Sequence, residues 1–164
     1  MSLLNDFLIK NTDFKKVKIL CVGDVILDRF ISGNVDRVSP EAPIPVLNSK
    51  TQKDILGGAG NVIANISSLG ASAEIVSCIG NDQEGSIIKK LIDDLANTKG
   101  RLFVDKKRVS TTKERYVSGS QHLLRVDKED KKEIEKSLEK KIKTLINKSI
   151  NAFALRSRIR YCNS

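Results

Sequence analysis

The order of strand-like and helix-like segments constrains the fold of this chain more than any other feature. Residues 17–27 and 73–80 are near-continuous apolar runs with many β-branched side chains. Such runs are typical of strands that are buried on both faces of a parallel sheet. A helical segment begins at Ala59, between the two runs, and Gly70 ends it. The alternation predicts an α/β protein with a parallel sheet, in which helices pack on the sheet faces.

The remaining segments are predicted from the same patterns. Residues 29–54 contain all three prolines of the chain, which indicates extended or edge segments joined by turns. Residues 101–105 are a third strand, and residues 111–127 are typical of two strands around a Ser-Gly-Ser turn. Two further helices are expected over residues 84–97 and 129–148. The side chains expected to face inward are Val62, Ile63, Ile66 and Leu69, and then Ile87, Ile88, Leu91, Ile92 and Leu95. Only three core strands result, so we expect an incomplete sheet.

Charge and composition narrow the class of protein. The formal net charge is +9. From Lys128 onward there are eleven basic and five acidic residues, so the residues before Lys128 carry a net charge of only +3. The positive charge is therefore concentrated in the last predicted helix and the tail. Aromatic residues for base stacking make up only 4% of the chain, so we expect no nucleic-acid partner. No apolar run approaches the ~20 residues of a membrane span, and no signal peptide is evident. We therefore expect a cytoplasmic protein without a membrane partner.

The three cysteines, Cys21, Cys78 and Cys162, have no CxxC spacing. An odd number without such spacing indicates neither a disulfide framework nor a zinc site. Because Cys21 and Cys78 lie inside the apolar runs, we expect them to be buried free thiols.

Residues 54–71, with the sequence DILGGAGNVIANISSLGA, carry a glycine cluster that runs directly into the first predicted helix. A dinucleotide-binding fingerprint is excluded, because Ile63 stands where its third glycine should be and the preceding stretch is polar. Residues 80–86 have the glycine spacing of a phosphate-binding P-loop, but no lysine follows Gly85, and the acidic residues between would repel a phosphate. Neither nucleotide motif explains the cluster.

Four separated blocks of the sequence point to one family. They begin GDVILD, LGGAGN, VSCIGN and TTKERY, and they span residues 23–47, 56–71, 76–85 and 111–127. In this order they resemble the ribokinase-like, PfkB-type carbohydrate kinases, most closely the heptose 7-phosphate kinase branch of lipopolysaccharide-core precursor synthesis. The resemblance implies an α/β fold, a ribokinase-like parallel sheet flanked by helices, with a small β lid formed by about residues 29–54 and 111–127. The implied activity transfers the γ-phosphoryl group of ATP, with Mg²⁺, to the anomeric hydroxyl of a heptose 7-phosphate.

The resemblance also implies a sugar site around the glycine cluster. Gly57 and Gly58 would leave room for a polyol to approach the backbone, and Asn61 would offer a donor and an acceptor to neighbouring hydroxyls. Asp28 would accept hydrogen bonds from two hydroxyls of the sugar. The residues alone leave a second interpretation open, in which the glycines form the turn into the helix and Asp28 and Asn61 are caps.

Three basic residues of the predicted hairpin, Lys113, Arg115 and Arg125, are candidates for binding a sugar phosphate. A cation paired with phosphate makes charge-assisted hydrogen bonds. The alternative is that these side chains only face solvent, as long basic side chains on a hairpin often do. His122 has no second ligand or nucleophile at a useful spacing, so we expect it on the surface.

The catalytic element of the family is not found in this sequence. In ribokinase-like kinases a late Gly-Ala-Gly-Asp supplies the base and the backbone amides that stabilise the transferred group. This chain has one Gly-Ala-Gly, at residues 58–60, and Asn61 follows it. We therefore predict no catalytic residue, poor binding of ATP and Mg²⁺, and no phosphoryl transfer by this chain alone.

We interpret residues 1–148 as the N-terminal portion of a ribokinase-like domain. Residues 149–164 are an unmatched tail, of the kind that a shift of reading frame produces. The chain is then a truncated heptose kinase. The alternative is a non-catalytic remnant that binds sugar phosphates or forms a homodimer through the lid.

Overall fold

The computed structural model of the 164-residue chain describes residues 14–154 and 161–163. A 3-10 helix, η1 (Phe14–Lys16), precedes two four-stranded sheets, which we call the body sheet and the lid sheet. The body sheet has the strand order β5-β4-β1-β8, and the lid sheet has the order β3-β2-β6-β7. The strands are β1 (Lys18–Val22), β2 (Val25–Val38), β3 (Pro45–Gly58), β4 (Ser72–Gly80), β5 (Thr98–Asp105), β6 (Thr112–Ser118), β7 (Gln121–Lys128) and β8 (Tyr161–Asn163).

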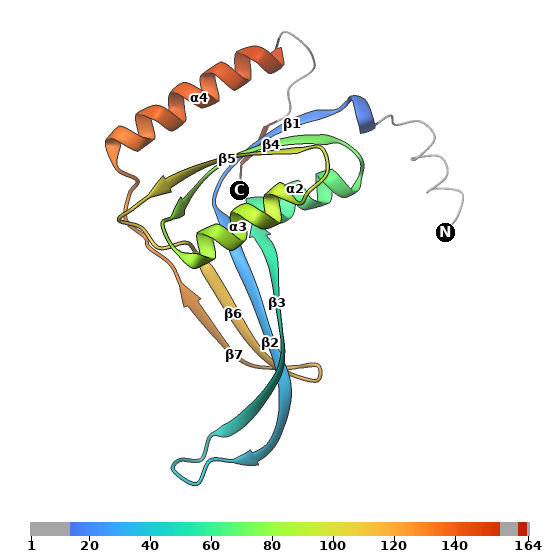
Figure 1. Cartoon of the computed structure of the whole chain (residues 1–164), viewed down its shortest axis with the longest axis vertical. Helices are drawn as coiled ribbons and strands as arrows, with labels where there is room; N and C mark the ends of the chain where they lie inside the picture. Colours follow the sequence, from blue (N-terminus) through green and yellow to red (C-terminus); the bar gives the residue numbers. More distant parts are fainter. Residues whose placement is uncertain (1–13, 155–160, 164) are drawn as a thin grey trace, which may run out of the picture.

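The body is a parallel sheet with helices on both faces (Figure 1). α2 (Ala59–Ser68) and α3 (Gln83–Asp93) cover one face, and α4 (Lys136–Ala154) lies over the other. The fully buried isoleucines of the core between the sheet and the first two helices are Ile63, Ile75, Ile88 and Ile92. The prediction of a parallel α/β fold is therefore confirmed, and the apolar run over residues 73–80 forms β4.

The first apolar run is divided between the two sheets, which corrects the prediction of one strand over residues 17–27. Only Gly23 and Asp24 separate β1 from β2. The Gly23 amide donates to the Val76 carbonyl at 3.3 Å, and the Asp24 carbonyl accepts from the Ala59 amide at 2.9 Å. The chain leaves the body at this point, so one continuous apolar run contributes to two sheets. We call this junction between the body and the lid sheet the seam.

β2 and β3 form one long antiparallel hairpin, paired from Val25↔Gly58 to Val38↔Pro45. The expectation of extended or edge segments joined by turns over residues 29–54 is confirmed for β3, which lies at an edge of the lid sheet, whereas β2 is an inner strand. The prolines fit this pairing, since they lie in the far turn or at the first position of β3, outside the interior of a strand. Figure 1 shows the hairpin extending away from the body.

β6 joins the lid sheet parallel to β2 and pairs with it from Leu27 to Gly33. β6 and β7 form the predicted hairpin, with Gly119 at a φ of +58° in its turn. Among the described strands, only β3 pairs with β2 beyond Gly33. Register irregularities in that pairing follow Ser32 and Val35, so they lie at or beyond the end of the β2–β6 contact.

The first two helices differ from the predictions at their ends. α2 buries Ile63 completely, but Leu69 comes after the helix and is 59% exposed, which corrects its assignment to the core. α3 ends at Asp93, so the predicted helix over residues 84–97 is too long. The other side chains predicted to face inward are partly buried against the core: Val62, Ile66, Ile87, Leu91 and Leu95.

α4 begins at Lys136, seven residues after the predicted start of the helix over residues 129–148. The segment before this start is bound by Arg108, which donates to the carbonyl of Asp130 at 3.2 Å and also to the carbonyl of Lys132. The first turn of the helix begins at Glu135, whose carbonyl accepts from the amides of Leu138 and Glu139.

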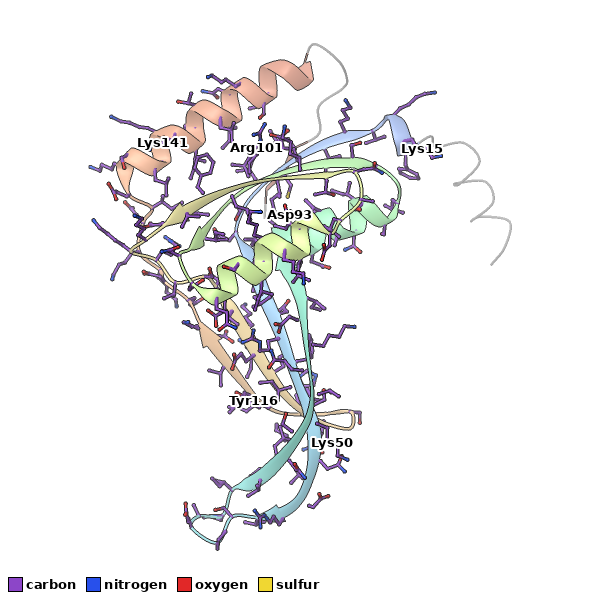
Figure 2. The ribbon with its side chains drawn as sticks, viewed as in Figure 1. Lys15, Lys50, Asp93, Arg101, Tyr116 and Lys141 are labelled. Atoms are coloured by element: carbon purple, nitrogen blue, oxygen red, sulfur yellow. The ribbon has the colours of Figure 1, made fainter. Side chains whose placement is uncertain are left out.

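The residues predicted as an unmatched tail, 149–164, fall partly within described elements. α4 continues to Ala154, and β8 pairs parallel with β1. Ser149 is buried and donates to Glu74 at 3.3 Å, and Glu74 also pairs with Arg101 at 3.2 Å. Arg101 lies between the body sheet and α4 (Figure 2). The rest of the predicted tail lies outside the described residues.

Cys21 is buried, as expected, whereas Cys78 is only half-buried, and neither forms a disulfide. Burial raises the pKa of the Cys78 thiol. Cys162 lies in β8. Among the described helices, none has the length and apolar character needed to cross a membrane.

Asp82 ties together the end of β4, the start of α3 and the entry to β6. Its carboxylate caps α3 by accepting from the Gly85 amide at 2.8 Å. It also accepts from the amide and the hydroxyl of the buried Ser110 at 2.8 and 2.6 Å. Burial alone would raise the pKa of Asp82, but the hydrogen bonds from Ser110 and Gly85 outweigh it and lower that pKa.

Replacing Asp82 by alanine should lower the free energy of unfolding by about 2 kcal/mol at pH 7. The variant loses a helix cap and leaves the Ser110 hydroxyl without its acceptor. Because the folded-state pKa lies below the unfolded value, the contribution of Asp82 is complete above the unfolded pKa and is lost as the pH falls through the folded pKa. Urea unfolding curves of variant and wild type should therefore converge in acid.

The control for this experiment is Asp93→Ala. The Asp93 side chain is 54% exposed and pairs only with Lys89 on the surface of α3 among the residues described. Its replacement should change the free energy of unfolding by less than about 0.5 kcal/mol. A loss for Asp82→Ala that stays equal at neutral and acid pH would contradict the assignment.

Candidate functional site

The structure places four of the seven predicted site residues on one face of the lid sheet. In the register, Asp28 on β2 lies beside Lys113 on β6, and Phe30 lies beside Arg115. Arg115 in turn faces Arg125 on β7. Because side chains alternate along a strand, the four predicted residues project from the same side. We call this side the front face.

Gly57 is the position at which the backbone makes room for Asp28. It pairs with Ile26, and a Cβ added to Gly57 would fall on the carboxylate of Asp28. The sequence interpretation gave that space to the sugar itself. The structure instead gives it to the carboxylate, which therefore lies directly against a backbone without a side chain.

Gly58 makes the turn from β3 into α2. Its φ is +55°, a region that favours glycine, and a Cβ there would lie 2.5 Å from the Asp24 carbonyl oxygen. The structure therefore supports the interpretation in which Gly58 forms the turn into the helix. Asn61 is not the cap, because Gly58 holds the N-cap position and α2 has no side-chain cap. Asn61 is exposed, and its Oδ1 accepts from Asn65 at 3.5 Å.

The three candidate cations have different surroundings. Arg115 is not simply a solvent-facing side chain: its Nη1 lies 2.5 Å from Asp28 Oδ1, and both side chains are about one-fifth exposed. Its guanidinium carbon also lies 5.2 Å from the centre of the Phe30 ring, within cation–π range. Arg125 is 58% exposed and pairs with Asp127 of its own strand at 2.8 Å. Lys113 lines a pocket.

That pocket has a volume of about 410 Å³, within the usual range for small-molecule sites. It lies at the seam, and it is lined by Asp24, Ile26, Arg108, Thr111, Lys113 and residues 129–134. Sequence reasoning did not select Asp24 or Arg108. Asp24 belongs to the GDVILD block, which was a usable signal, whereas nothing near Arg108 in sequence indicates its contacts with residues 130 and 132.

The rear face of the lid sheet carries an ion cluster that sequence reasoning also missed. Arg29 binds Asp54 through both of its carboxylate oxygens, at 2.8 and 3.0 Å, and binds Glu114 at 3.3 Å. Hydrogen bonding to Asp54 is the main cause that raises the pKa of Arg29. Tyr116 donates to Glu114 at 3.1 Å and lies midway along the lid sheet (Figure 2). The cluster links β3, β2 and β6, which are the strands that carry Gly57, Asp28 and Arg115.

His122 is exposed on β7, as expected. Across residues 14–154 and 161–163, no group of three or more histidine, cysteine, aspartate or glutamate side chains is arranged to hold a metal ion.

A parallel α/β body with a four-stranded lid sheet of this kind is the ribokinase-like fold. The solved structure of a putative sugar kinase from Clostridium perfringens is similar to this chain, with a TM-score of 0.60 and 12% sequence identity. The similarity covers 89% of this chain and 51% of that one. At this identity the comparison shows the fold alone.

The sequence itself gives the family. The pattern of the pfkB family carbohydrate kinases matches residues 16–150, and the chain belongs to this family. The bifunctional protein HldE of Caulobacter vibrioides is 49% identical over 113 residues, and the HldE of Aliarcobacter butzleri is 36% identical over 140 residues. These matches cover 69% and 85% of this chain, but only 23% and 29% of the relatives. The chain thus spans about a quarter of the length of these curated relatives.

The contact between Asp28 and Gly57 can be tested by a double-mutant cycle. Gly57→Ala should lower the free energy of unfolding by about 1–3 kcal/mol, because the added Cβ overlaps the Asp28 carboxylate. The same substitution in an Asp28→Ala background should cost less, since the overlapping group is gone. Thermal or urea unfolding of the four proteins measures the difference. Equal costs in both backgrounds would show that Gly57 is required for another reason.

Proposed function

We propose that the front face at the seam binds a sugar phosphate, and that the sugar is a heptose 7-phosphate. The observation that carries the proposal is the position of the Asp28 carboxylate, which lies against the bare backbone of Gly57 and beside two cationic side chains. A carboxylate offers two oxygens to vicinal hydroxyls, and the cations suit a phosphate. The choice of heptose rests on the sequence blocks that resemble the heptose 7-phosphate kinases.

Each predicted residue has a role in this proposal. Asp28 accepts hydrogen bonds from sugar hydroxyls, and Asn61, exposed at the start of α2, supplies a donor and an acceptor. Gly57 keeps the backbone bare beside Asp28, and Gly58 makes the turn that leads from this strand into α2. Lys113, Arg115 and the more exposed Arg125 provide the charge that attracts the phosphate.

The described residues do not supply the groups that the transfer of the phosphoryl group needs, namely a base and free backbone amides. The Gly-Ala-Gly of this sequence lies at residues 58–60, where the Ala59 amide already donates to the Asp24 carbonyl at 2.9 Å. The residue after it is Asn61, whose neutral amide cannot accept the proton of a sugar hydroxyl. We therefore assign no step with ATP or Mg²⁺ to these residues. We propose a cytoplasmic chain that binds the sugar and does not phosphorylate it alone.

Calorimetric titration of the 164-residue chain with heptose 7-phosphate tests the proposal. Asp28→Asn should raise the dissociation constant by about 10- to 100-fold, the loss expected for hydrogen bonds to a charged acceptor. Asp36→Asn is the matched control, because Asp36 lies on the same strand and is exposed near the hairpin tip. Wild-type affinity in Asp28→Asn, or no binding by the wild type, would refute the proposed site.

A coupled ADP-release assay on the same folded sample tests the second half of the proposal. With ATP, magnesium and heptose 7-phosphate, we expect no sugar-dependent turnover. Turnover above the control without sugar would show that the chain does contain a base and a nucleotide site.

The alternative function is dimerisation through the lid. Leu124 and Val126 favour it, because they are 57% and 43% exposed on β7, the edge strand of the lid sheet. An edge strand with exposed apolar side chains is suited to pairing with another chain.

If the lid forms a homodimer, the double substitution Leu124→Lys and Val126→Lys should shift sedimentation equilibrium from dimer to monomer. Two added charges on the edge strand oppose pairing of identical chains. Leu69→Lys is the control, because Leu69 is 59% exposed on the body and should leave the mass unchanged. A wild type that sediments as a monomer would exclude this function.

A further inference from the structure

The two arginines that project from opposite faces of the lid sheet differ in how completely their donors are used. On the rear face, Arg29 binds two carboxylates, and Nε, Nη1 and Nη2 each have an acceptor. On the front face, only Nη1 of Arg115 has acceptors among the described residues, namely Asp28 at 2.5 Å and the Lys113 carbonyl at 3.4 Å. Since a guanidinium has five N–H donors, Arg115 keeps most of its donors available for a ligand.

The surroundings of Arg115 hold the guanidinium in place without satisfying it. Its guanidinium carbon lies over the Phe30 ring, 5.2 Å from the ring centre, and the Arg115 side chain is only 21% exposed. Its register neighbour is Arg125, a like charge whose own partner is Asp127. Within the described chain, Asp28 is thus the one carboxylate that pairs with Arg115. A second anion would find a partly desolvated cation with free donors.

Asp28 differs from Arg115, because one of its two carboxylate oxygens already accepts a hydrogen bond. Oδ1 is bound to Arg115, and Oδ2 lies over Gly57. A sugar whose hydroxyls bind both oxygens competes with Arg115 for Oδ1. A neutral sugar would leave the guanidinium without a carboxylate, whereas a sugar with an anionic group supplies a replacement.

We propose that Arg115 makes this site selective for anionic sugars by exchanging partners, from Asp28 in the free chain to the anionic group of the ligand in the complex. The exchange frees Asp28 for the sugar hydroxyls. The inference rests on the proposed sugar site and adds the residue that distinguishes phosphorylated from neutral sugars. Arg125 does not take this role, because it is more exposed and is paired within its own strand.

The first test compares heptose 7-phosphate with the same heptose lacking phosphate, by calorimetric titration. The wild type should bind the phosphorylated sugar more tightly. Arg115→Gln should weaken binding of the phosphorylated sugar by at least about tenfold and strengthen binding of the neutral sugar several-fold, because the competitor for Asp28 is removed. Arg37→Gln is the control, because Arg37 is exposed on β2 toward the hairpin tip, and it should change the ratio of the two affinities by less than about threefold.

The second test needs no variant. If Arg115 exchanges partners, inorganic phosphate should draw it from Asp28 and so lower the dissociation constant of the neutral heptose several-fold, relative to chloride at equal ionic strength. Such positive coupling between two ligands is reciprocal, so the neutral sugar should also tighten the binding of phosphate.

The outcomes separate the inference from the function on which it rests. No binding of either sugar by the wild type would refute the proposed site and the inference together. Binding of the phosphorylated sugar that Arg115→Gln leaves unchanged, or equal weakening of both sugars, would refute the inference alone. A neutral-sugar affinity that does not respond to inorganic phosphate would also overturn it, even if the variant failed to fold.

Discussion

The hydrogen bonds at the seam are the constraint on which both sheets depend. β2 leaves the body there, β3 returns there, and β6 enters the lid there. The Asp24 carbonyl accepts from Ala59 and the Leu27 amide donates to the Thr111 carbonyl, both at 2.9 Å. A third bond, at 3.1 Å, joins the Val25 amide to the hydroxyl of the buried Ser77 in β4. Three crossings of the chain are thus fixed to one another and to the central sheet.

This arrangement explains why the candidate site lies where it does. Asp28 comes one residue after Leu27, and Gly57 comes one residue before the turn at Gly58. Both therefore lie next to backbone hydrogen bonds of the seam and far from the tip of the hairpin. The rear cluster around Arg29 adds side-chain links between the same strands one position farther out. The candidate site lies on the front face, and the ion cluster on the rear face joins the same strands.

Much of the fold was predictable from local patterns. The apolar run of β4, the helical spacing of apolar residues in α2 and α3, and the turn of the β6–β7 hairpin can all be recognised from residues that are close in sequence. The predictions that were wrong depend on distant contacts. Nothing in a continuous apolar run marks the change of sheet at Gly23 and Asp24, and the segment before α4 is bound by Arg108, more than twenty residues away in sequence.

The candidate site also has features that the sequence predicts and features that depend on contacts between distant residues. Resemblance selected the residues of the front face, but it could not rank Arg115 above Arg125, because only the register shows which of them reaches Asp28. It also could not show that the space beside Gly57 belongs to a carboxylate. Sequence reasoning missed the rear cluster because Arg29, Asp54 and Glu114 are far apart in sequence and belong to no motif.

The register irregularities of the long hairpin determine where its length can change without disturbing the pairing near the seam. They follow Ser32 and Val35, at and beyond the end of the segment of β2 that β6 covers. A strand that slips by one residue exchanges its two faces, and such a slip near Asp28 would place Arg29 on the front face. Because the irregular positions lie farther out, residues can be gained or lost at the tip while the pairing near the seam stays in phase. The length of the hairpin beyond Gly33 can therefore change without moving Asp28 off the front face.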